Sequence, residues 1–194
     1  MTSFAFVFPG QGSQAVGMLD AWGDHPAIAA TLAEASAALG EDIAALIKNG
    51  PKEQLDLTTN TQPVMLTAGI ACYRAWMAET GLMPAAVAGH SLGEYTALVA
   101  SGALSLADAL PLVRLRAQAM QEAVPVGVGA MAAILGLDAS AVQAGCAEAA
   151  AACGEAVEAA NFNDPKQTVI SGTKAGVDKA CEMLKAKGAK RALP

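Results

Sequence analysis

The sequence predicts an α/β fold in two parts, a core built on a parallel sheet and a smaller subdomain. Its 194 residues, of which 54% are hydrophobic and 15% charged, are enough to bury a sizeable core. Short apolar runs alternate with alanine-rich helical segments over residues 1–126, which is typical of a parallel sheet. After Gly127 and Gly129 the pattern changes to strand, helix, two strands, helix and strand.

The first expected element of the core is a strand over residues 4–8, which ends at Pro9. A helix with Asp24 as its N-cap follows and ends at Leu39. Thr61 is the expected cap of a later helix. The other expected elements are helices over residues 42–49 and 106–123, a strand over residues 85–88, and a helix from there to Gly102.

The second part has the order βαββαβ, which is that of a ferredoxin-like subdomain. Its expected strands cover residues 130–137, 156–161, 167–171 and 189–193, and its helices cover residues 140–152 and, capped by Thr173, residues 174–187. The predicted domains are therefore residues 1–126 and residues 127–194.

Charge is distributed unevenly along the chain. The net charge is −6, but residues 161–194 carry seven cations against three anions, a balance of +4 that leaves −10 on residues 1–160. A weakly basic docking surface that includes Lys190 and Arg191 is one interpretation, and a solvated helix face is the other. The acidity of the whole chain argues against nucleic acid as a partner.

Neither a membrane segment nor an export signal is expected. No charge-free stretch reaches the roughly 18 apolar residues of a membrane span, and the opening residues lack a basic region. We therefore expect a cytoplasmic protein. The four cysteines form no CxxC pair and have no histidines at metal-ligand spacing, so we expect reduced core thiols and no metal site.

The run Gly89-His90-Ser91-Leu92-Gly93 fits the pattern GxSxG and lies between an expected strand and an expected helix. Its glycines allow a sharp turn that would expose Ser91 at a helix start, where free N–H groups favour developing negative charge. An ordinary glycine-rich turn with a capping serine is the alternative. The position between strand and helix favours Ser91 as a catalytic nucleophile.

The loop from Pro9 to Gln14 is rich in glycine and follows the first expected strand. It does not match a nucleotide-binding loop, because the glycine after Gly12 is Gly17 and no Gly-Lys-Ser/Thr is present. Such a loop can instead offer backbone N–H groups to an oxyanion, which a serine nucleophile requires. A plain turn is the alternative.

Arg116 is expected to lie on the apolar stripe of its helix, and Arg114 on the polar face. The stripe is expected to comprise Leu112, Leu115, Ala119, Met120 and Ala123. A guanidinium on a core-facing stripe keeps its charge and needs an anionic partner. That partner is either an internal carboxylate, for example Glu94, or a carboxylate of the substrate.

Histidine is scarce, because the chain has only His25 and His90. His90 is adjacent to Ser91 on a tight turn, where neighbouring side chains diverge. His25 is at an expected helix start and is expected to cap or pack there. We therefore expect the general base for Ser91 to lie beyond Pro194.

Three segments, Phe8–Gln14, Gly89–Tyr95 and Arg116 with Met120-Gln121-Glu122, together resemble bacterial malonyl-CoA:acyl carrier protein transacylases. The resemblance covers the whole chain, through Asn161-Phe162-Asn163 to Lys190-Arg191. It implies an α/β-hydrolase-like parallel-sheet core with an inserted ferredoxin-like subdomain.

The resemblance also implies an activity, the transfer of malonyl from malonyl-CoA to the phosphopantetheine thiol of acyl carrier protein in fatty-acid synthesis. Ser91 would be acylated, and Arg116 would pair with the malonyl carboxylate. Backbone N–H groups of Gln11 and Leu92 would form the oxyanion hole, and Gln62 and Met120 would line the pocket. No metal, cofactor, membrane or nucleic acid is implied.

Members of that family continue past the point at which this chain ends. Their catalytic histidine and the return of the chain to the core sheet are therefore expected beyond Pro194. A chain of this extent is expected to be a poor catalyst, because a general base contributes about 10²- to 10⁴-fold. Two other functions stay open, namely a serine hydrolase such as a thioesterase or acyl-lipid hydrolase, and a non-catalytic module that binds a carrier protein.

Overall fold

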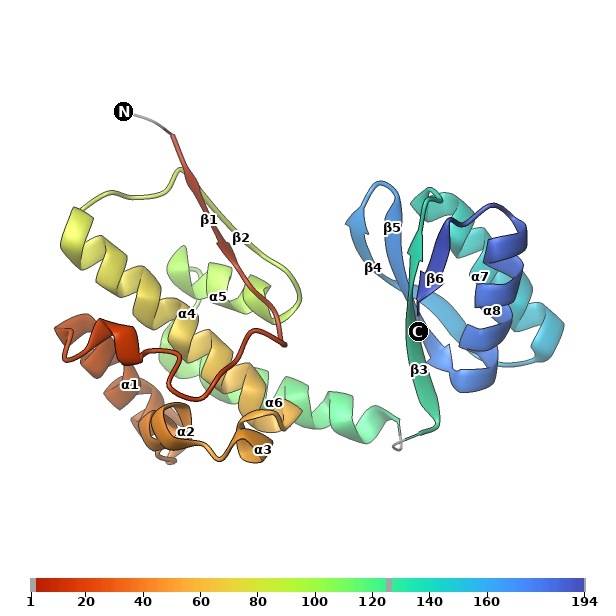
Figure 1. Ribbon diagram of the computed structural model, residues 1–194. Coiled ribbons are helices and arrows are strands. Elements are labelled where there is room, and N and C mark those ends of the chain that lie inside the picture. Colours follow the sequence, from red (N-terminus) through yellow and green to blue (C-terminus); the bar gives the residue numbers. More distant parts are fainter. Residues whose placement is uncertain (1–2, 125–126, 194) are drawn as a thin grey trace. The chain divides into compact units, whose positions relative to one another are not determined.

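The structure, a computed structural model, describes residues 3–124 and 127–193 and contains two compact units (Figure 1). One unit is Met1–Glu122 and the other is Ala123–Pro194. Both units contain helices and strands, so the predicted mixed α/β class is confirmed. The boundary expected from the sequence, between residues 126 and 127, lies inside the second unit.

The first unit is mostly helical, with one pair of strands. Its elements are β1 (Ala5–Phe8), the short 3-10 helix η1 (Asp20–Trp22), α1 (Pro26–Leu39), α2 (Ile43–Asn49), α3 (Lys52–Leu55), α4 (Thr58–Thr80), β2 (Ala86–Gly89), α5 (Leu92–Ala100) and α6 (Leu106–Ala123). β1 and β2 pair in parallel, with Phe8 opposite Gly89. The loop after β1 and the turn after β2 therefore begin at the same end of the sheet (Figure 1).

Helix α4 forms the centre of the first unit's core. Over its middle it is apolar on every side, and Val64, Leu66, Ile70 and Ala71 are at most 1% exposed. A helix that is apolar all round is stable only when other elements cover it. Here α1 and α5 pack against it. This buried helix is the support on which the turn after β2 is held.

Two expected helix caps are wrong. Asp24 does not cap α1, because His25 is the N-cap and its Nδ1 accepts a hydrogen bond from the N–H of Ala27 at 3.1 Å. Thr61 lies inside α4, where its hydroxyl donates to the backbone oxygen of Leu55 at 2.6 Å. A Ser, Thr or Asp just before a proline is a common cap signal, but α1 has His25 as its N-cap, and α4 already begins at Thr58 with Leu57 as its N-cap.

Over residues 127–193 the second unit has one four-stranded sheet and two helices. Its elements are β3 (Gly129–Leu135), α7 (Ala139–Cys153), β4 (Val157–Asp164), β5 (Gln167–Thr173), α8 (Lys174–Ala186) and β6 (Arg191–Leu193). The strand order is β4-β5-β3-β6, and all neighbouring strands are antiparallel. Figure 1 shows α7 and α8 on one face of this sheet, where Ile134, Ile170 and Leu184 are fully buried.

The four cysteines are all free thiols, but they differ in exposure. Cys146 and Cys181 are buried and Cys72 is half-buried, as expected of core thiols. Cys153 is exposed, which corrects that expectation, because it is the last residue of α7. Burial raises the pKa of Cys146 to about 11 and also raises the pKa values of Cys72 and Cys181.

We predict that Cys153 reacts first with a water-soluble disulfide reagent at pH 8. A raised thiol pKa lowers the fraction of reactive thiolate, and burial blocks access, so Cys146 and Cys181 should react only after unfolding. The measurement is the number of thiols modified with time, with and without guanidinium chloride. Cys153→Ser should remove the fast phase, and its persistence in that variant would contradict the assignment.

Within the part of the chain that the structure describes, none of the helices combines the length and apolarity that a membrane crossing requires. The same residues contain no group of three or more His, Cys, Asp or Glu side chains that could hold a metal ion.

Candidate active site

Ser91 lies at the turn between β2 and α5 and is the N-cap of α5. Its backbone has φ +54° and ψ −113°, and among the described residues it is the only one other than glycine with a positive φ. A side chain in this conformation costs free energy, and such strain is found where a function requires it. The predicted sharp strand-turn-helix that carries Ser91 is confirmed.

The two glycines of GxSxG are required by close backbone contacts. A Cβ on Gly89 would stand 2.0 Å from the carbonyl carbon and oxygen of Gly93. A Cβ on Gly93 would stand 2.2 Å from the backbone oxygen of Phe8. Because these obstacles are backbone atoms, no side-chain rotation could make room. The glycines therefore let the turn fold tightly against β1.

We predict that Gly93→Ala destabilises the first unit by about 2 to 3 kcal/mol or more, since the methyl group must displace β1. Gly69→Ala is the control and should cost less, because the three atoms nearest to a Cβ there belong to the side chains of Thr96 and Phe8 and not to the backbone. Thermal melts of both variants test this. Equal stability of Gly93→Ala and the parent would contradict the tight turn.

The loop from Pro9 to Gln14 lies beside this turn. A Cβ on Gly10 would stand 3.1 Å from the backbone oxygen of His90. The side chain of Gln11 donates to Thr58 Oγ1 at 3.2 Å, and that of Gln14 donates to Asp56 Oδ1 at 2.9 Å. These bonds tie the loop to Asp56, which follows α3, and to Thr58, the first residue of α4. The short distance at Gly10 places the loop beside the turn at His90.

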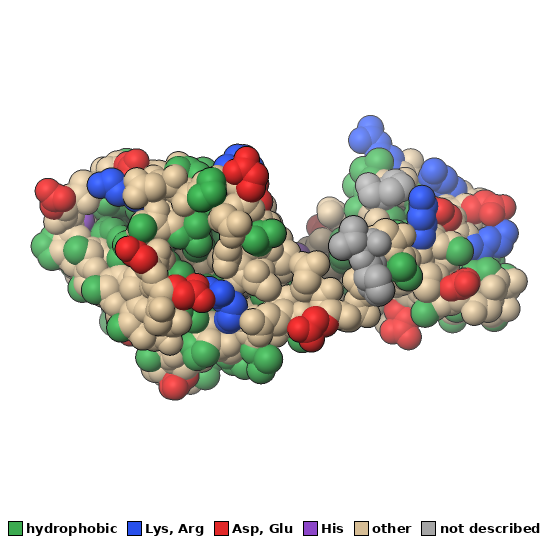
Figure 2. Space-filling view, turned by 90° about the horizontal axis from the view of Figure 1, so that it is seen from below, with side chains coloured by type: hydrophobic (Ala, Val, Ile, Leu, Met, Phe, Trp, Pro, Cys, Tyr) green, Lys and Arg blue, Asp and Glu red, His purple; other side chains and the backbone are tan. Residues whose placement is uncertain are grey.

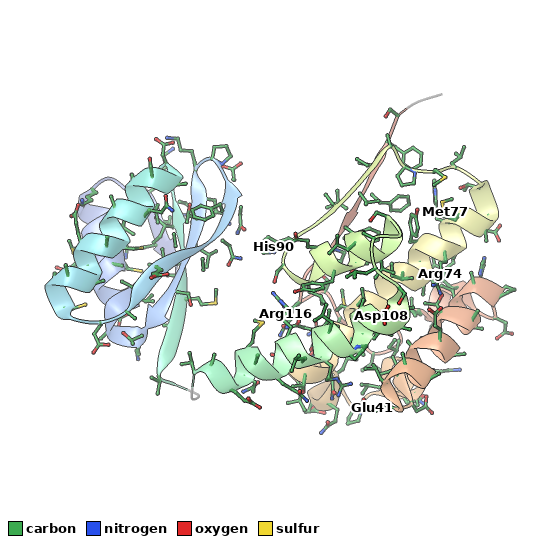
Figure 3. The ribbon with its side chains drawn as sticks, turned by 180° about the vertical axis from the view of Figure 1, so that it is seen from behind. Glu41, Arg74, Met77, His90, Asp108 and Arg116 are labelled. Carbon is green, nitrogen blue, oxygen red and sulfur yellow. The ribbon has the colours of Figure 1, made fainter. Side chains whose placement is uncertain are left out.

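Arg116 reaches from α6 to the turn (Figure 3). Its Nη2 donates to Ser91 Oγ at 2.9 Å, and its Nη1 donates to Gln62 Oε1 at 2.7 Å. Gln62 is 1% exposed, and its Nε2 lies 3.4 Å from the sulfur of Met120. The structure thus brings together Gln62 of α4, Arg116 and Met120 of α6, and Ser91 at the turn before α5.

The expected apolar stripe of α6 is wrong in its position. Leu115 is 61% exposed and Met120 is 50% exposed. The buried face consists of Leu106, Ala109, Leu110, Val113 and Ala117. Alanine and leucine occur all round this helix, so their spacing does not identify one face. Arg116 is half-buried at the border of the buried face.

The two arginines of α6 have different partners. Arg114, expected on the polar face, forms a two-point ion pair with Glu41 at 3.0 and 2.6 Å. Over residues 3–124 and 127–193, no carboxylate lies within ion-pair distance of Arg116, so the expected alternative of a bond to Glu94 is wrong. Among the described residues, the side-chain hydrogen bonds of Arg116 go to the neutral oxygens of Ser91 and Gln62.

The two histidines lie in different places. His25 caps α1, and its Nε2 lies 3.0 Å from Glu79 Oε1, so the expected capping role is confirmed. The backbone oxygen of His90 accepts a hydrogen bond from the N–H of Gly93 at 2.9 Å. The Nδ1 of His90 would be 3.7 Å from a Cβ on Gly10, so its ring lies toward the loop after β1.

The basic stretch at residues 161–194 folds against acidic residues. Lys166 pairs with Asp138 at 2.7 Å and Lys187 with Glu148 at 2.6 Å, and the second unit as a whole has seven cations and seven anions. Figure 2 shows the mixture of Lys or Arg with Asp or Glu side chains on this unit. Lys190 and Arg191 are exposed. Within residues 127–193 no carboxylate pairs with them.

Sequence reasoning missed one residue of the site, Tyr95. The Cζ atom of Arg116 lies 5.6 Å from the centre of the Tyr95 ring, which is within the range of a cation–π contact. The available signal was spacing, because Tyr95 follows Ser91 by four residues in a helix and must share its face.

Comparison with known proteins identifies the family. The family model described as "Acyl transferase domain" matches residues 5–193 of this chain. The chain is 56% identical over 195 residues to malonyl CoA-acyl carrier protein transacylase of Escherichia coli K12, covering all of this chain and 62% of that protein.

Solved structures support the same family assignment. The acyl-carrier-protein S-malonyltransferase of Burkholderia pseudomallei is 68% identical with a TM-score of 0.89, over 100% of this chain and 62% of that one. A malonyl-transacylase in complex with a type II PKS acyl-carrier protein is 49% identical with a TM-score of 0.88, over 100% of this chain and 62% of that one. The chain thus spans about 62% of the length of these relatives, and it belongs to the acyl transferase domain family.

Proposed function

We propose that this chain carries the nucleophile and the acyl-binding residues of an enzyme of fatty-acid biosynthesis. That enzyme would transfer malonyl from malonyl-CoA to the phosphopantetheine thiol of acyl carrier protein. The observation that carries the proposal is the hydrogen bond of 2.9 Å from Arg116 to Ser91 Oγ. It places an unneutralised cation beside a nucleophile, which suits an acyl group that ends in a carboxylate. The names of the relatives support this assignment.

The proposed reaction has two half-reactions that share Ser91. Ser91 Oγ attacks the thioester carbonyl carbon of malonyl-CoA, its proton passes to a base, and the carbonyl oxygen becomes an oxyanion. Backbone N–H groups of Gln11 and Leu92 would stabilise that charge. The C–S bond then breaks, and coenzyme A leaves as its thiol after taking up the proton. The carrier-protein thiol attacks the malonyl-serine ester in the same way and regenerates Ser91.

Arg116 would change partners when the substrate binds. In the structure it donates to Ser91 Oγ and to Gln62 Oε1. A malonyl carboxylate would accept both N–H bonds more strongly than a hydroxyl does. Binding would then free Ser91 Oγ for attack, and Gln62 and Met120 would border the acyl group.

The proposed chemistry needs no metal or tightly bound cofactor, because Ser91 supplies the nucleophile and backbone N–H groups supply the oxyanion site. It does need a base for the proton of Ser91. His25 is engaged with Glu79 and with the N–H of Ala27. We propose that a histidine in the part of the relatives that this chain does not span takes that role.

We also propose that residues 1–126 form part of an α/β-hydrolase-like core and that residues 127–194 form a ferredoxin-like subdomain. The parallel pair β1–β2 and the strand-turn-helix at Ser91 support the first assignment. The strand order β4-β5-β3-β6, with two helices on one face, supports the second. The substrates, malonyl-CoA and acyl carrier protein, would be met in the cytoplasm.

We predict that replacing Lys190 and Arg191 together by alanine raises the KM for the acidic carrier protein or for malonyl-CoA by about 2- to 10-fold, because two exposed cations are lost. The defect should shrink as salt is added, since salt screens the parent's charges. A double variant at Lys179 and Lys187, whose charges are paired with glutamates, is the matched control. An unchanged KM at low salt would contradict a docking role for Lys190 and Arg191 and would favour the interpretation of a solvated helix face.

The function is tested by mixing the protein with malonyl-CoA and carrier protein, with imidazole as an external base, and separating the products. Malonyl-carrier protein is expected as the main product. Free malonate in its place would indicate a thioesterase, and carrier binding without acylation of Ser91 would indicate a binding module. An acyl chain without a carboxylate would leave Arg116 unpaired, which disfavours an acyl-lipid hydrolase.

A further inference from the structure

Tyr95 is a half-buried aromatic residue of α5 whose ring faces the guanidinium of Arg116. The distance from Arg116 Cζ to the ring centre is 5.6 Å. Tyr95 also packs against the buried cluster of the first unit, so its ring is held in place from behind. Ser91, four residues earlier, is the N-cap of the same helix, and its Oγ accepts a hydrogen bond from the same guanidinium of Arg116.

The contacts of Arg116 restrict it in different ways. Its hydrogen bonds to Ser91 Oγ and Gln62 Oε1 act at the nitrogen atoms. The ring of Tyr95 acts on the charge of the guanidinium and uses none of its N–H groups. If a substrate carboxylate takes over the hydrogen bonds, the ring contact remains. It is therefore the contact that can keep Arg116 at a fixed distance from Ser91 throughout the reaction.

We propose that Tyr95 is a positioning residue that sets the site's preference for acyl groups with a terminal carboxylate, a role that rests on the proposed function. Its ring holds the guanidinium of Arg116 at the distance from Ser91 Oγ that an acyl group with one carbon between carbonyl and carboxylate requires. A single helix, α5, thus carries both the nucleophile and the support of the carboxylate-binding group. Loss of the ring leaves Arg116 charged but free to turn away.

The test compares Tyr95→Leu, which removes the ring, with Tyr95→Phe, which keeps it. Tyr73→Leu is the matched control, because the chain's other tyrosine packs on Phe6 and Phe8, with ring-centre distances of 5.5 and 6.2 Å. Sodium malonate is titrated into protein labelled with ¹⁵N-arginine, and the Arg116 guanidinium resonance, assigned with Arg116→Lys, is followed. Acetate serves as the comparison ligand, and melting temperatures report folding.

We expect Tyr95→Leu to weaken malonate binding by about 3- to 30-fold, to leave acetate binding unchanged, and to shift the Arg116 resonance as the ring's shielding is lost. Tyr95→Phe should retain most of the affinity. Tyr73→Leu should lower the melting temperature without moving the Arg116 resonance. In an Arg116→Ala background, Tyr95→Leu should have no further effect on malonate, because the ring acts through the guanidinium.

The proposal is overturned if Tyr95→Leu binds malonate like the parent, or if the parent binds malonate no better than acetate. It is also overturned if Tyr95→Phe is as defective as Tyr95→Leu, since the hydroxyl and not the ring would then matter. A malonate effect without any malonyl-serine in the parent after incubation with malonyl-CoA and imidazole would instead contradict the proposed transfer. Failure of the Tyr95 proposal and failure of the proposed malonyl transfer therefore give different results.

Discussion

Ser91→Ala is expected to abolish acyl transfer and to leave the fold intact. The change removes only Oγ, the atom that forms the ester. Removal of a catalytic serine lowers kcat by at least about 10⁴-fold in serine enzymes. Alanine keeps the Cβ, so the strain at φ +54° stays the same and the turn should not rearrange. The measurement is the rate of malonyl transfer at matched concentrations of folded protein.

Ser101→Ala is the control for this experiment. Ser101 follows α5, and its hydroxyl donates to the backbone oxygen of Leu98, away from the turn at Ser91. It should transfer malonyl at the parent rate. Transfer by Ser91→Ala at a comparable rate would exclude Ser91 as the nucleophile.

Arg116→Ala is expected to reduce selectivity more than stability. A charge-assisted hydrogen bond contributes about 1.5 to 3 kcal/mol, so the acylation rate with malonyl-CoA should fall by about 10- to 150-fold relative to acetyl-CoA. Acetyl-CoA lacks the carboxylate and should be affected much less. It could even gain, because the bond from Arg116 to Ser91 Oγ would no longer hold the nucleophile. Single-turnover acylation with the two thioesters measures this ratio.

Arg114→Ala is the matched control, because it removes the same charge two residues away. Arg114 is paired with Glu41, so its loss should lower the melting temperature without changing the preference for malonyl over acetyl. Equal losses with the two thioesters in Arg116→Ala would indicate a structural role for Arg116.

The turn at Ser91 could be predicted because its signal is local. Only glycine fits where a Cβ would meet backbone atoms, as at Gly89 and Gly93, so the pattern itself reports the geometry. The cap of α8 by Thr173 was predictable for the same reason, since its hydroxyl accepts from the N–H of Gly176 three residues on.

The faces of α6 could not be predicted, because they depend on what packs against the helix. Apolar residues occur on most sides of it, and Leu115 and Met120 are exposed. Arg116 was singled out as a cation on an expected apolar stripe, although the buried face of α6 is a different one. Its actual partners, Gln62 and Tyr95, come from α4 and α5 and are polar or aromatic residues with many other possible roles. Tertiary packing alone brings them together.

The surface charge of the basic end of the chain could not be predicted either, because it also depends on residues from elsewhere in the chain. Counting residues 161–194 gives +4, but Asp138 and Glu148 come from earlier in the chain and pair with Lys166 and Lys187. A local charge count therefore overstated the basic surface. Among the described residues, the exposed cations of this stretch without an ion pair are Lys174, Lys185, Lys190 and Arg191.

The central claim is that Ser91 takes a malonyl group from malonyl-CoA. The most direct test is the intact mass of the protein after incubation with malonyl-CoA, followed by peptide mapping. Added imidazole can serve as an external base, because general-base assistance is worth about 10²- to 10⁴-fold. The account predicts the addition of one malonyl group on the peptide that contains Ser91. No adduct in the presence of imidazole, or an adduct on any other residue, would contradict it.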